Sequence, residues 1–160
     1  MKILEDIFLS DSIEIRTAPD KVFDFLCNIV DDDSFRAWHP KDHVTFRWLK
    51  GSPWQEGSIG YSEEYLHGEL HKGKIFVTKA VPNSEITYVP FSRLIRKFVP
   101  KMCFYIVPKK DSCVFTATVH GRFPRMIQFI AKKRYDKNLA SVKKHMKEEG
   151  ENLKRILEKE

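Results

Sequence analysis

The spacing of hydrophobic positions along the chain changes several times, and these changes predict the order of the elements. Between residues 12 and 16 polar and apolar side chains alternate, which is typical of a half-buried strand. From residue 19 to residue 30 the apolar side chains recur at helical spacing, after a proline in the first turn. The polar run at 31–34 ends this helix and caps a second short one over 35–38. The first quarter of the chain therefore predicts one strand followed by two short helices.

Alternation of polar and apolar side chains returns repeatedly between residues 44 and 120. The predicted strands are residues 44–49, 59–66, 70–81, 85–91, 102–107 and 113–120. Turn-forming residues such as Gly51, Gly68 and Pro82 stand between them. We therefore expect a run of antiparallel strands in the middle of the chain.

The C-terminal segment, residues 124–160, predicts one long helix. After Pro124 it contains no further proline and a single glycine. One apolar stripe within about 60° is formed by Tyr135, Leu139, Val142, Met146, Leu153 and Leu157. Met126, Ile127 and Ile130 point roughly the opposite way, so either the helix bends near residues 131–134 or its first turns have an apolar face of their own.

Length and composition favour a single globular domain over residues 1–160. Hydrophobic residues make up 42% and charged residues 31% of the chain, and its 12 phenylalanines can fill a core or line a cavity. No apolar run is long enough to span a bilayer. Glu5 and Asp6 stand where a signal peptide would need a basic start.

The cysteines indicate in which cellular compartment the protein resides. Cys27, Cys103 and Cys113 have no metal or redox spacing, and the predicted hairpin places Cys103 opposite roughly Thr118 rather than Cys113. Three free thiols suit a reducing compartment. We therefore expect a cytoplasmic protein.

The order strand, two helices, six strands and long helix resembles the helix-grip fold of the START-like, or Bet v 1-like, superfamily, which includes pollen allergens, polyketide cyclases and lipid-transfer proteins. The resemblance rests on residues 12–15, 18–23, 37–40, 86–88 after 81–83, and 145–154. The last of these segments is similar to a branch near the polyketide cyclases and dehydrases. The resemblance implies an α+β fold, in which a curved seven-stranded antiparallel sheet wraps around the C-terminal helix and leaves an apolar cavity between them.

Bulky side chains on the predicted strands and helix are candidates for the wall of such a cavity. They are Phe46, Trp48, Tyr61, Tyr65, Tyr88, Phe104, Phe115, Tyr135, Leu139, Val142 and Met146. Aromatic walls supply contact area, and tyrosine hydroxyls can orient a polar end of a ligand. We therefore expect a small or medium hydrophobic ligand, such as a lipid, a polyketide-like compound or an aromatic compound.

Histidines near the second short helix form a second candidate site with the terminal helix. His39 and His43 flank the end of the short helix, and His145 and Glu149 share a face of the long one at i, i+4 spacing. Imidazoles and a carboxylate suit zinc or another divalent metal ion. The alternative is a polar seam, in which Glu149 accepts hydrogen bonds from a histidine or from the Trp38 indole and fixes the helix.

A group of titratable side chains surrounds the turn between the predicted strands 59–66 and 70–81. Charged groups around a hairpin are usually solvated. Glu64 is the better candidate for a carboxylate aimed into the cavity, because Ile59, Tyr61 and Tyr65 occupy the other face of its strand. As an alternative to simple binding, the protein could be a cyclase, dehydratase or hydrolase with His39, Glu64 or Glu149 as the acid/base group.

The sequence lacks the motifs of several enzyme classes. It contains no Gly-x-Ser-x-Gly, no phosphate-binding glycine loop and no paired Cys-x-x-Cys. We expect no cofactor, with a divalent metal ion as the alternative.

The basic residues, which give a net charge of +6, gather in two segments. Residues 91–101 and 122–134 both interleave cations with apolar side chains, which suits an anionic membrane surface and peripheral lipid transfer. The alternative is that their apolar members close the cavity mouth and their cations are solvated. No nucleic-acid partner is expected, because neither a stacking platform nor a reading helix is evident.

Overall fold

The computed structural model describes residues 3–159, and its elements follow the predicted order. The strands are β1 (Leu4–Ile15), β2 (His43–Lys50), β3 (Ile59–Leu66), β4 (Glu69–Val81), β5 (Glu85–Pro90), β6 (Lys101–Pro108) and β7 (Cys113–Pro124). The helices are α1 (Pro19–Cys27), α2 (Asp32–Trp38), α3 (Arg93–Arg96), α4 (Arg125–Ile130) and α5 (Lys132–Leu157). Among the described residues, no helix combines the length and the apolar character needed to cross a bilayer.

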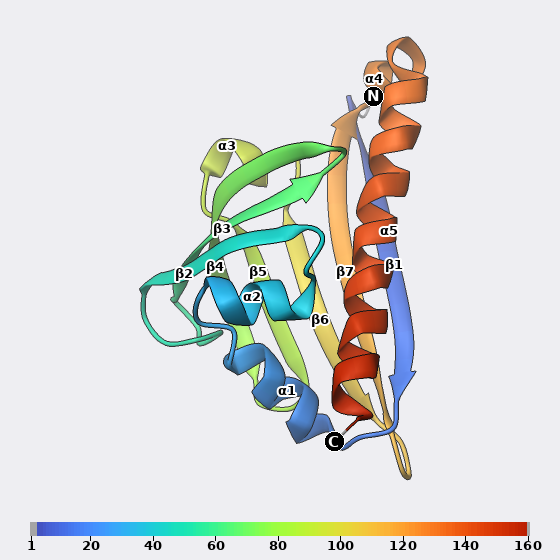
Figure 1. The fold of residues 1–160 in the computed structure, drawn as a ribbon. Coiled ribbons are helices and arrows are strands. Elements are labelled where there is room, and N and C mark those ends of the chain that lie inside the picture. The colour runs from blue at the N-terminus through green and yellow to red at the C-terminus, as the bar shows by residue number, and fades with distance from the viewer. Residues whose placement is uncertain (1–2, 160) are drawn as a thin grey trace.

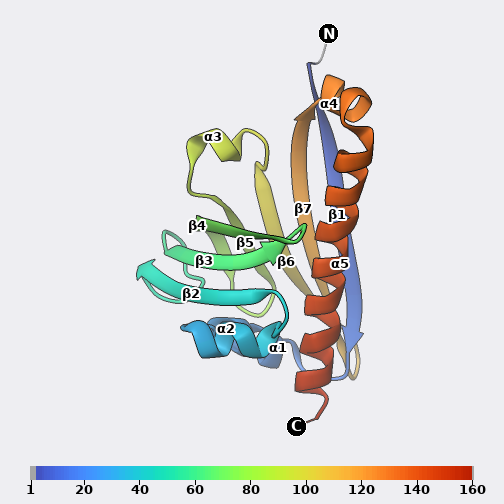
Figure 2. The ribbon, with the colours of Figure 1, turned by 45° about the horizontal axis from the view of Figure 1, so that its top comes forward.

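All strands join one antiparallel sheet of seven strands in the order β1-β7-β6-β5-β4-β3-β2. The sheet curves around α5, which lies along β1 and β7, while α1 and α2 lie between the β2 edge and the C-terminal half of α5 (Figures 1 and 2). The predicted helix-grip architecture is therefore confirmed. Cys103 lies opposite Thr118, as expected, and the three thiols are free.

The first strand is longer than its alternating pattern predicts. It begins at Leu4 rather than near residue 12 and pairs with β7 along its whole length. β1 is an edge strand, and its outer face carries the exposed Phe8 while its inner face carries Leu9. Because apolar side chains lie on both faces here, the period-two pattern is lost over the first eight residues.

The C-terminal segment forms two helices, α4 and α5, with a bend between them. The prediction of one helix over residues 124–160 is corrected accordingly. α4 ends at Ile130, and Ala131 leaves the helical conformation with φ −121° and ψ 37°. The apolar side chains of α4 are exposed, whereas those of α5 face the sheet. Of the two alternatives left open by the opposed apolar faces, the structure shows the bend near residues 131–134.

The helix α2 begins with a reciprocal cap that fixes the neighbourhood of the histidines. Asp31 accepts a hydrogen bond from the Ser34 amide at 2.8 Å, and the Ser34 hydroxyl accepts one from the Asp31 amide at 3.1 Å. This start directs Phe35 and Trp38 into the interior, where both are buried. His39 then ends the helix, and His43 opens β2.

The hydrophobic core lies mainly beside the C-terminal half of α5. Ile15, Val22, Leu26 and Leu153 are fully buried there. The helix also approaches β1 closely at Gly150, where a Cβ atom would lie 3.2 Å from Cγ2 of Ile13. This close contact positions Glu149 and His145, which lie on the neighbouring turns of α5.

Candidate functional site

A cavity of about 290 Å³ lies between the sheet and the middle of α5. Its walls include the predicted Phe46, Tyr88, Phe104, Val142 and Met146. Phe35, Trp38, Trp54, Ile75 and Ala117 also line it, although the sequence did not single them out. Most of the lining is therefore hydrophobic.

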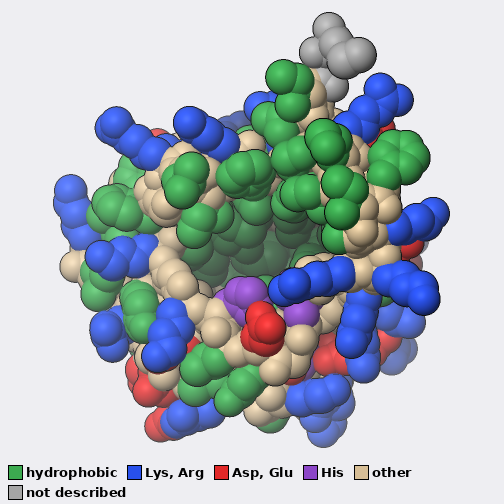
Figure 3. Space-filling view, turned by 90° about the horizontal axis from the view of Figure 1, so that it is seen from above, with side chains coloured by type: hydrophobic (Ala, Val, Ile, Leu, Met, Phe, Trp, Pro, Cys, Tyr) green, Lys and Arg blue, Asp and Glu red, His purple; other side chains and the backbone are tan. Residues whose placement is uncertain are grey.

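The cavity opens toward the end of the molecule where α3 and α4 lie. Viewed from this side, the surface is hollowed and the walls of the hollow are hydrophobic, while basic side chains stand around the rim (Figure 3). Val99 and Val119 belong to the lining as well. An apolar molecule could therefore enter from this end.

Trp54 closes part of the cavity from the connection between β2 and β3. Its indole Nε1 donates to the Leu26 carbonyl at 2.9 Å, and its ring packs edge-on against Tyr88 and Phe104. Gly51 starts this connection with φ +79°, and any Cβ there would clash with Oγ of Ser58. The buried tryptophan is held by a tight loop, which the alternating pattern of the strands could not indicate.

Two tyrosines that we expected in the wall lie on the outer face of β3. The inner face carries Ser62, Glu64 and Leu66, so the alternation of the strand directs Tyr61 and Tyr65 away from the cavity. Arg47 lies 4.6 Å from the centre of the Tyr61 ring, and Tyr65 is exposed in an outer groove. Their expected wall positions are therefore corrected.

Four other predicted wall residues also lie outside the lining of the cavity. Phe115 is in the packed core beside Phe104, and Trp48 packs behind Phe46 and Trp54. Tyr135 lies against Phe123 near the start of α5, and Leu139 is half-buried one turn later. The helical stripe is longer than the cavity, so only its middle residues, Val142 and Met146, reach the lining.

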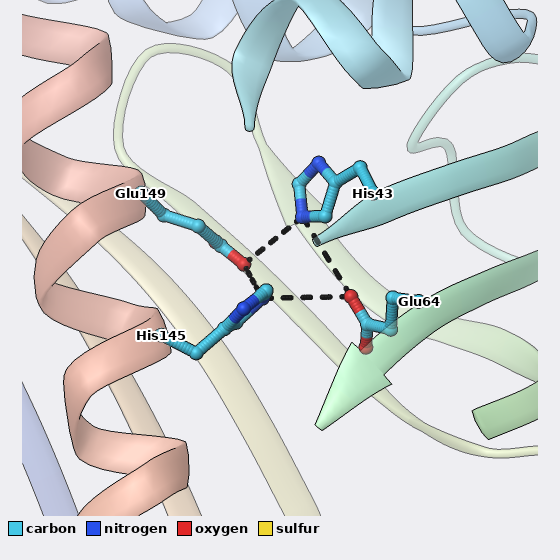
Figure 4. A group of neighbouring side chains, drawn as sticks. All are labelled: His43, Glu64, His145 and Glu149. Atoms are coloured by element: carbon cyan, nitrogen blue, oxygen red, sulfur yellow. Dashed lines mark hydrogen bonds and ion pairs between the residues drawn. The ribbon is translucent and has the colours of Figure 1, made fainter. Parts of the chain in front are cut away.

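Four polar side chains converge on the wall of the cavity: His43, Glu64, His145 and Glu149 (Figure 4). His43 and Glu64 are cross-strand neighbours on β2 and β3, and they face the i, i+4 pair on α5. Nε2 of His43 lies 3.3 Å from Oε1 of Glu149 and 3.6 Å from Oε2 of Glu64. Nε2 of His145 lies 3.5 Å from Oε2 of Glu64 and also contacts Oε1 of Glu149.

Hydrogen bonds behind the cluster fix the orientation of both imidazole rings. Nδ1 of His43 donates to the Phe35 carbonyl at 2.9 Å, and Nδ1 of His145 donates to Oδ2 of Asp42 at 3.0 Å. The His43 ring also stacks on Phe35, with ring centres 3.8 Å apart. Each Nδ1 therefore carries a proton, and each Nε2 is directed at the carboxylates.

Burial and charge act in opposite directions within this cluster. Burial disfavours the charged form of His145, but the Glu149 and Glu64 carboxylates outweigh it and raise the pKa of His145 to about 12. Burial would raise the pKa of Glu149, yet His145 and His43 hold that pKa well below its usual range. The two carboxylates therefore create a strong local preference for positive charge.

His39 lies beside the cluster rather than within the group of four. Its Nε2 lies 2.9 Å from Oε2 of Glu148, its Nδ1 accepts from the Asp42 amide at 3.1 Å, and its ring stacks on His145. Burial and the two neighbouring histidines lower the pKa of His39. The residues expected to bind a metal ion fall into two groups that share His145: His43, Glu64, His145 and Glu149 form one, and His39, Asp42 and His145 form the other. Asp42 and Glu148 were missed from the sequence.

The remaining expectations for these residues concern the polar seam and the hairpin turn. The Glu149 carboxylate accepts a hydrogen bond from Nε2 of His43 at 3.3 Å, as the polar seam predicts. The Trp38 indole also bonds to Glu149, but at the backbone carbonyl, 3.1 Å away. Glu64 points into the cavity, whereas Glu63 pairs with Lys72 on the outer face. Of the three candidate acid/base groups, Glu64 and Glu149 line the cavity and His39 does not. A catalytic role for any of them stays a prediction.

The two basic segments meet at the mouth of the cavity. The Arg122 amide donates to the Phe98 carbonyl at 2.7 Å, which ties residues 122–134 to residues 91–101. Within them, α3 exposes 66% of Leu94, and α4 exposes 82% of Phe129 and 78% of Ile130. Leu94, Phe129 and Ile130 therefore project into solvent, whereas Val99 of residues 91–101 lines the cavity.

Similarity to known proteins is evident in the fold. No protein-family model matches the chain, and no curated protein matches its sequence. Norcoclaurine synthase from Thalictrum flavum superposes with a TM-score of 0.72 at 11% identity, over 98% of this chain and 96% of that chain. Another structure of that enzyme holds dopamine and hydroxybenzaldehyde.

A second similar structure is the major latex-like protein 151 from Panax ginseng. Its TM-score is 0.59 at 9% identity, over 91% of this chain and 99% of that chain. Together with the observed topology, these likenesses show that the chain has the Bet v 1-like helix-grip fold.

Proposed function

We propose that this protein binds a small apolar molecule in the cavity between α5 and the sheet, with a polar end of the molecule at the histidine–glutamate cluster. The observation that supports this function is the lining: hydrophobic walls with a few polar groups on one side. A volume of about 290 Å³ is just below the roughly 300–1,000 Å³ that is common for small-molecule sites. The ligand is accordingly small.

The apolar walls of the cavity supply the affinity for the ligand, and the polar groups in the lining orient the polar end of the ligand. Burying about 200 Å² of apolar ligand surface contributes roughly 5 kcal/mol before the cost of association. Polar groups in the lining include the hydroxyl of Tyr88 and the side chains of His43, Glu64, His145 and Glu149. Small aromatic phenols, like those that norcoclaurine synthase holds, are therefore suitable probes.

Tryptophan fluorescence offers a direct test, because Trp38 and Trp54 line the cavity. Titration with 4-hexylphenol is expected to change the emission and to saturate at one molecule per chain. Val142→Phe fills the cavity from α5 and is expected to weaken binding at least tenfold. The matched control Ala140→Phe adds the same side chain at an exposed position of α5 and leaves binding unchanged. Equal affinities of the two variants would overturn the proposal.

We propose, as a second function, that the mouth of the cavity docks on an anionic membrane surface. Leu94, Phe129 and Ile130 project from the same end of the molecule as Arg93 and Lys97, which are exposed. Apolar side chains enter the interface of a bilayer, and cations bind its headgroups. Docking there would place the open end of the cavity against the lipid. The test is co-sedimentation with phosphatidylcholine vesicles that contain or lack phosphatidylglycerol, and equal binding to both would reject it.

A further inference from the structure

We propose that His43, Glu64, His145 and Glu149 form a binding site for a divalent transition-metal ion, best matched by zinc. Two imidazole nitrogens and two carboxylate oxygens, one from each residue, lie within 4.8 Å of one another. Histidine and carboxylate are established ligands of zinc. The site goes beyond the binding of an apolar ligand, because the cavity could hold such a ligand without any ion.

The spacing of the four atoms is close to that of a tetrahedral site. A tetrahedral zinc ion with bonds of about 2.0–2.1 Å holds its ligand atoms roughly 3.3–3.4 Å apart. The separations from Glu149 to His43, from Glu64 to His145 and from Glu64 to His43 are 3.3, 3.5 and 3.6 Å. The contact between His145 and Glu149 is shorter, so the Glu149 carboxylate must move slightly away when the ion binds.

Hydrogen bonds at Nδ1 of the two imidazole rings leave Nε2 of each ring to bind a metal ion. Histidines that bind metals usually donate their other N–H to a carboxylate or a backbone carbonyl. Here Nδ1 of His145 donates to Asp42, and Nδ1 of His43 donates to the Phe35 carbonyl. With these Nδ1 protons fixed, each Nε2 faces the Glu149 carboxylate. A metal ion that binds displaces the Nε2 protons to solvent, and both Nε2 atoms then present lone pairs to the same point as the carboxylates.

One nitrogen of the cluster has no hydrogen bond among the described residues. Nε2 of His145 is buried, lies against the Glu149 carboxylate without hydrogen-bond geometry, and belongs to a side chain only 8% exposed. The two carboxylates that face these imidazoles in a mostly buried site require positive charge between them. A divalent ion supplies that charge and gives this nitrogen a partner.

An ion can also reach the site from outside. His145 lines an outer groove together with the carboxylates of Asp42 and Glu148, on the other side of the cluster from the cavity. The side chain of Glu64 is 27% exposed, so the site is not sealed. A bound ion would lie at the wall of the apolar cavity, where a ligand's polar end could approach it.

Equilibrium dialysis against ZnCl₂ tests the inference on the whole chain. Wild-type protein is expected to retain one zinc per chain after removal of free metal. Glu64→Gln should weaken zinc binding at least about tenfold, because it removes one anionic ligand. Glu63→Gln is the matched control, since Glu63 is next to Glu64 on β3 but faces outward and pairs with Lys72.

Cobalt(II) provides a readout of the ligand set. The wild-type complex should show the intense visible bands of four-coordinate cobalt, and Glu64→Gln should change them while Glu63→Gln does not. Asp42→Asn tests the positioning of His145: it should weaken binding about 10- to 100-fold and keep the four-coordinate spectrum. Each metal-free variant is first compared with wild type by thermal unfolding, which identifies a variant that fails to fold.

Two results would overturn the site. One is a wild-type zinc content no higher than that of a folded Glu64→Gln variant, and the other is an octahedral cobalt spectrum. The fluorescence titration with 4-hexylphenol is made on metal-free protein, so failure of the metal site is distinguished from failure of the cavity to bind a ligand.

Discussion

Nε2 of His43 lies 3.3 Å from Oε1 of Glu149, and this contact joins the edge strand β2 to the helix α5. It crosses the opening between the far edge of the sheet and the helix, so it bounds the cavity on one side (Figure 4). The same contact places polar groups beside walls that are otherwise hydrophobic. The position of α5 over the sheet and the chemistry of the cavity therefore depend on the same residues.

Trp38 is expected to stabilise this arrangement. Its indole donates to the Glu149 carbonyl at 3.1 Å, and its side chain is 3% exposed. Trp38→Phe removes the donor and part of the buried volume, so we expect a loss of about 1–3 kcal/mol in the free energy of unfolding. Urea unfolding measures this quantity. An unchanged unfolding midpoint would mean that the hydrogen bond does not hold the helix.

The sequence predicted the order of the elements and the approach of His43 to His145 and Glu149. Helical spacing alone shows that His145 and Glu149 share a face. The pairing of His43 with Glu64 could not be read from the sequence, because it depends on the register between β2 and β3. Alternation also leaves open which face of a strand is inward, which is why Tyr61 and Glu64 were both candidates for the cavity.

The hydrogen bonds of Asp6 make the stability of the protein depend on pH. Hydrogen bonds from His120 and Arg122 lower the pKa of the Asp6 carboxyl, and both measure 2.9 Å. A folded pKa below the unfolded value of about 3.9 stabilises the protein above that value, and the contribution is lost as the pH falls through the folded pKa. Asp6→Asn should therefore lower Tm at pH 7 and have little effect near pH 2. Equal shifts in Tm at both pH values would contradict this account.

Membrane docking predicts separable effects of apolar and charged substitutions at the mouth. Phe129→Ala with Ile130→Ala should reduce binding to vesicles that contain phosphatidylglycerol. Arg93→Gln with Lys97→Gln should reduce it by about fivefold per cation at low salt, since each contributes roughly 1 kcal/mol near an anionic surface.

The control for this surface is Phe8→Ala. Phe8 is 73% exposed, but it lies on the outer face of β1, where it stacks on His120. Its loss should leave vesicle binding unchanged. A decrease as large as that of the Phe129 and Ile130 variant would indicate nonspecific adsorption rather than docking through the mouth.

Native mass spectrometry with 4-hexylphenol shows whether the cavity holds one small apolar molecule. Wild type and Ala140→Phe should each show one bound molecule per chain, and Val142→Phe should show none at the same concentration. A complex of equal abundance in all three proteins, or no complex with wild type, would contradict the claim.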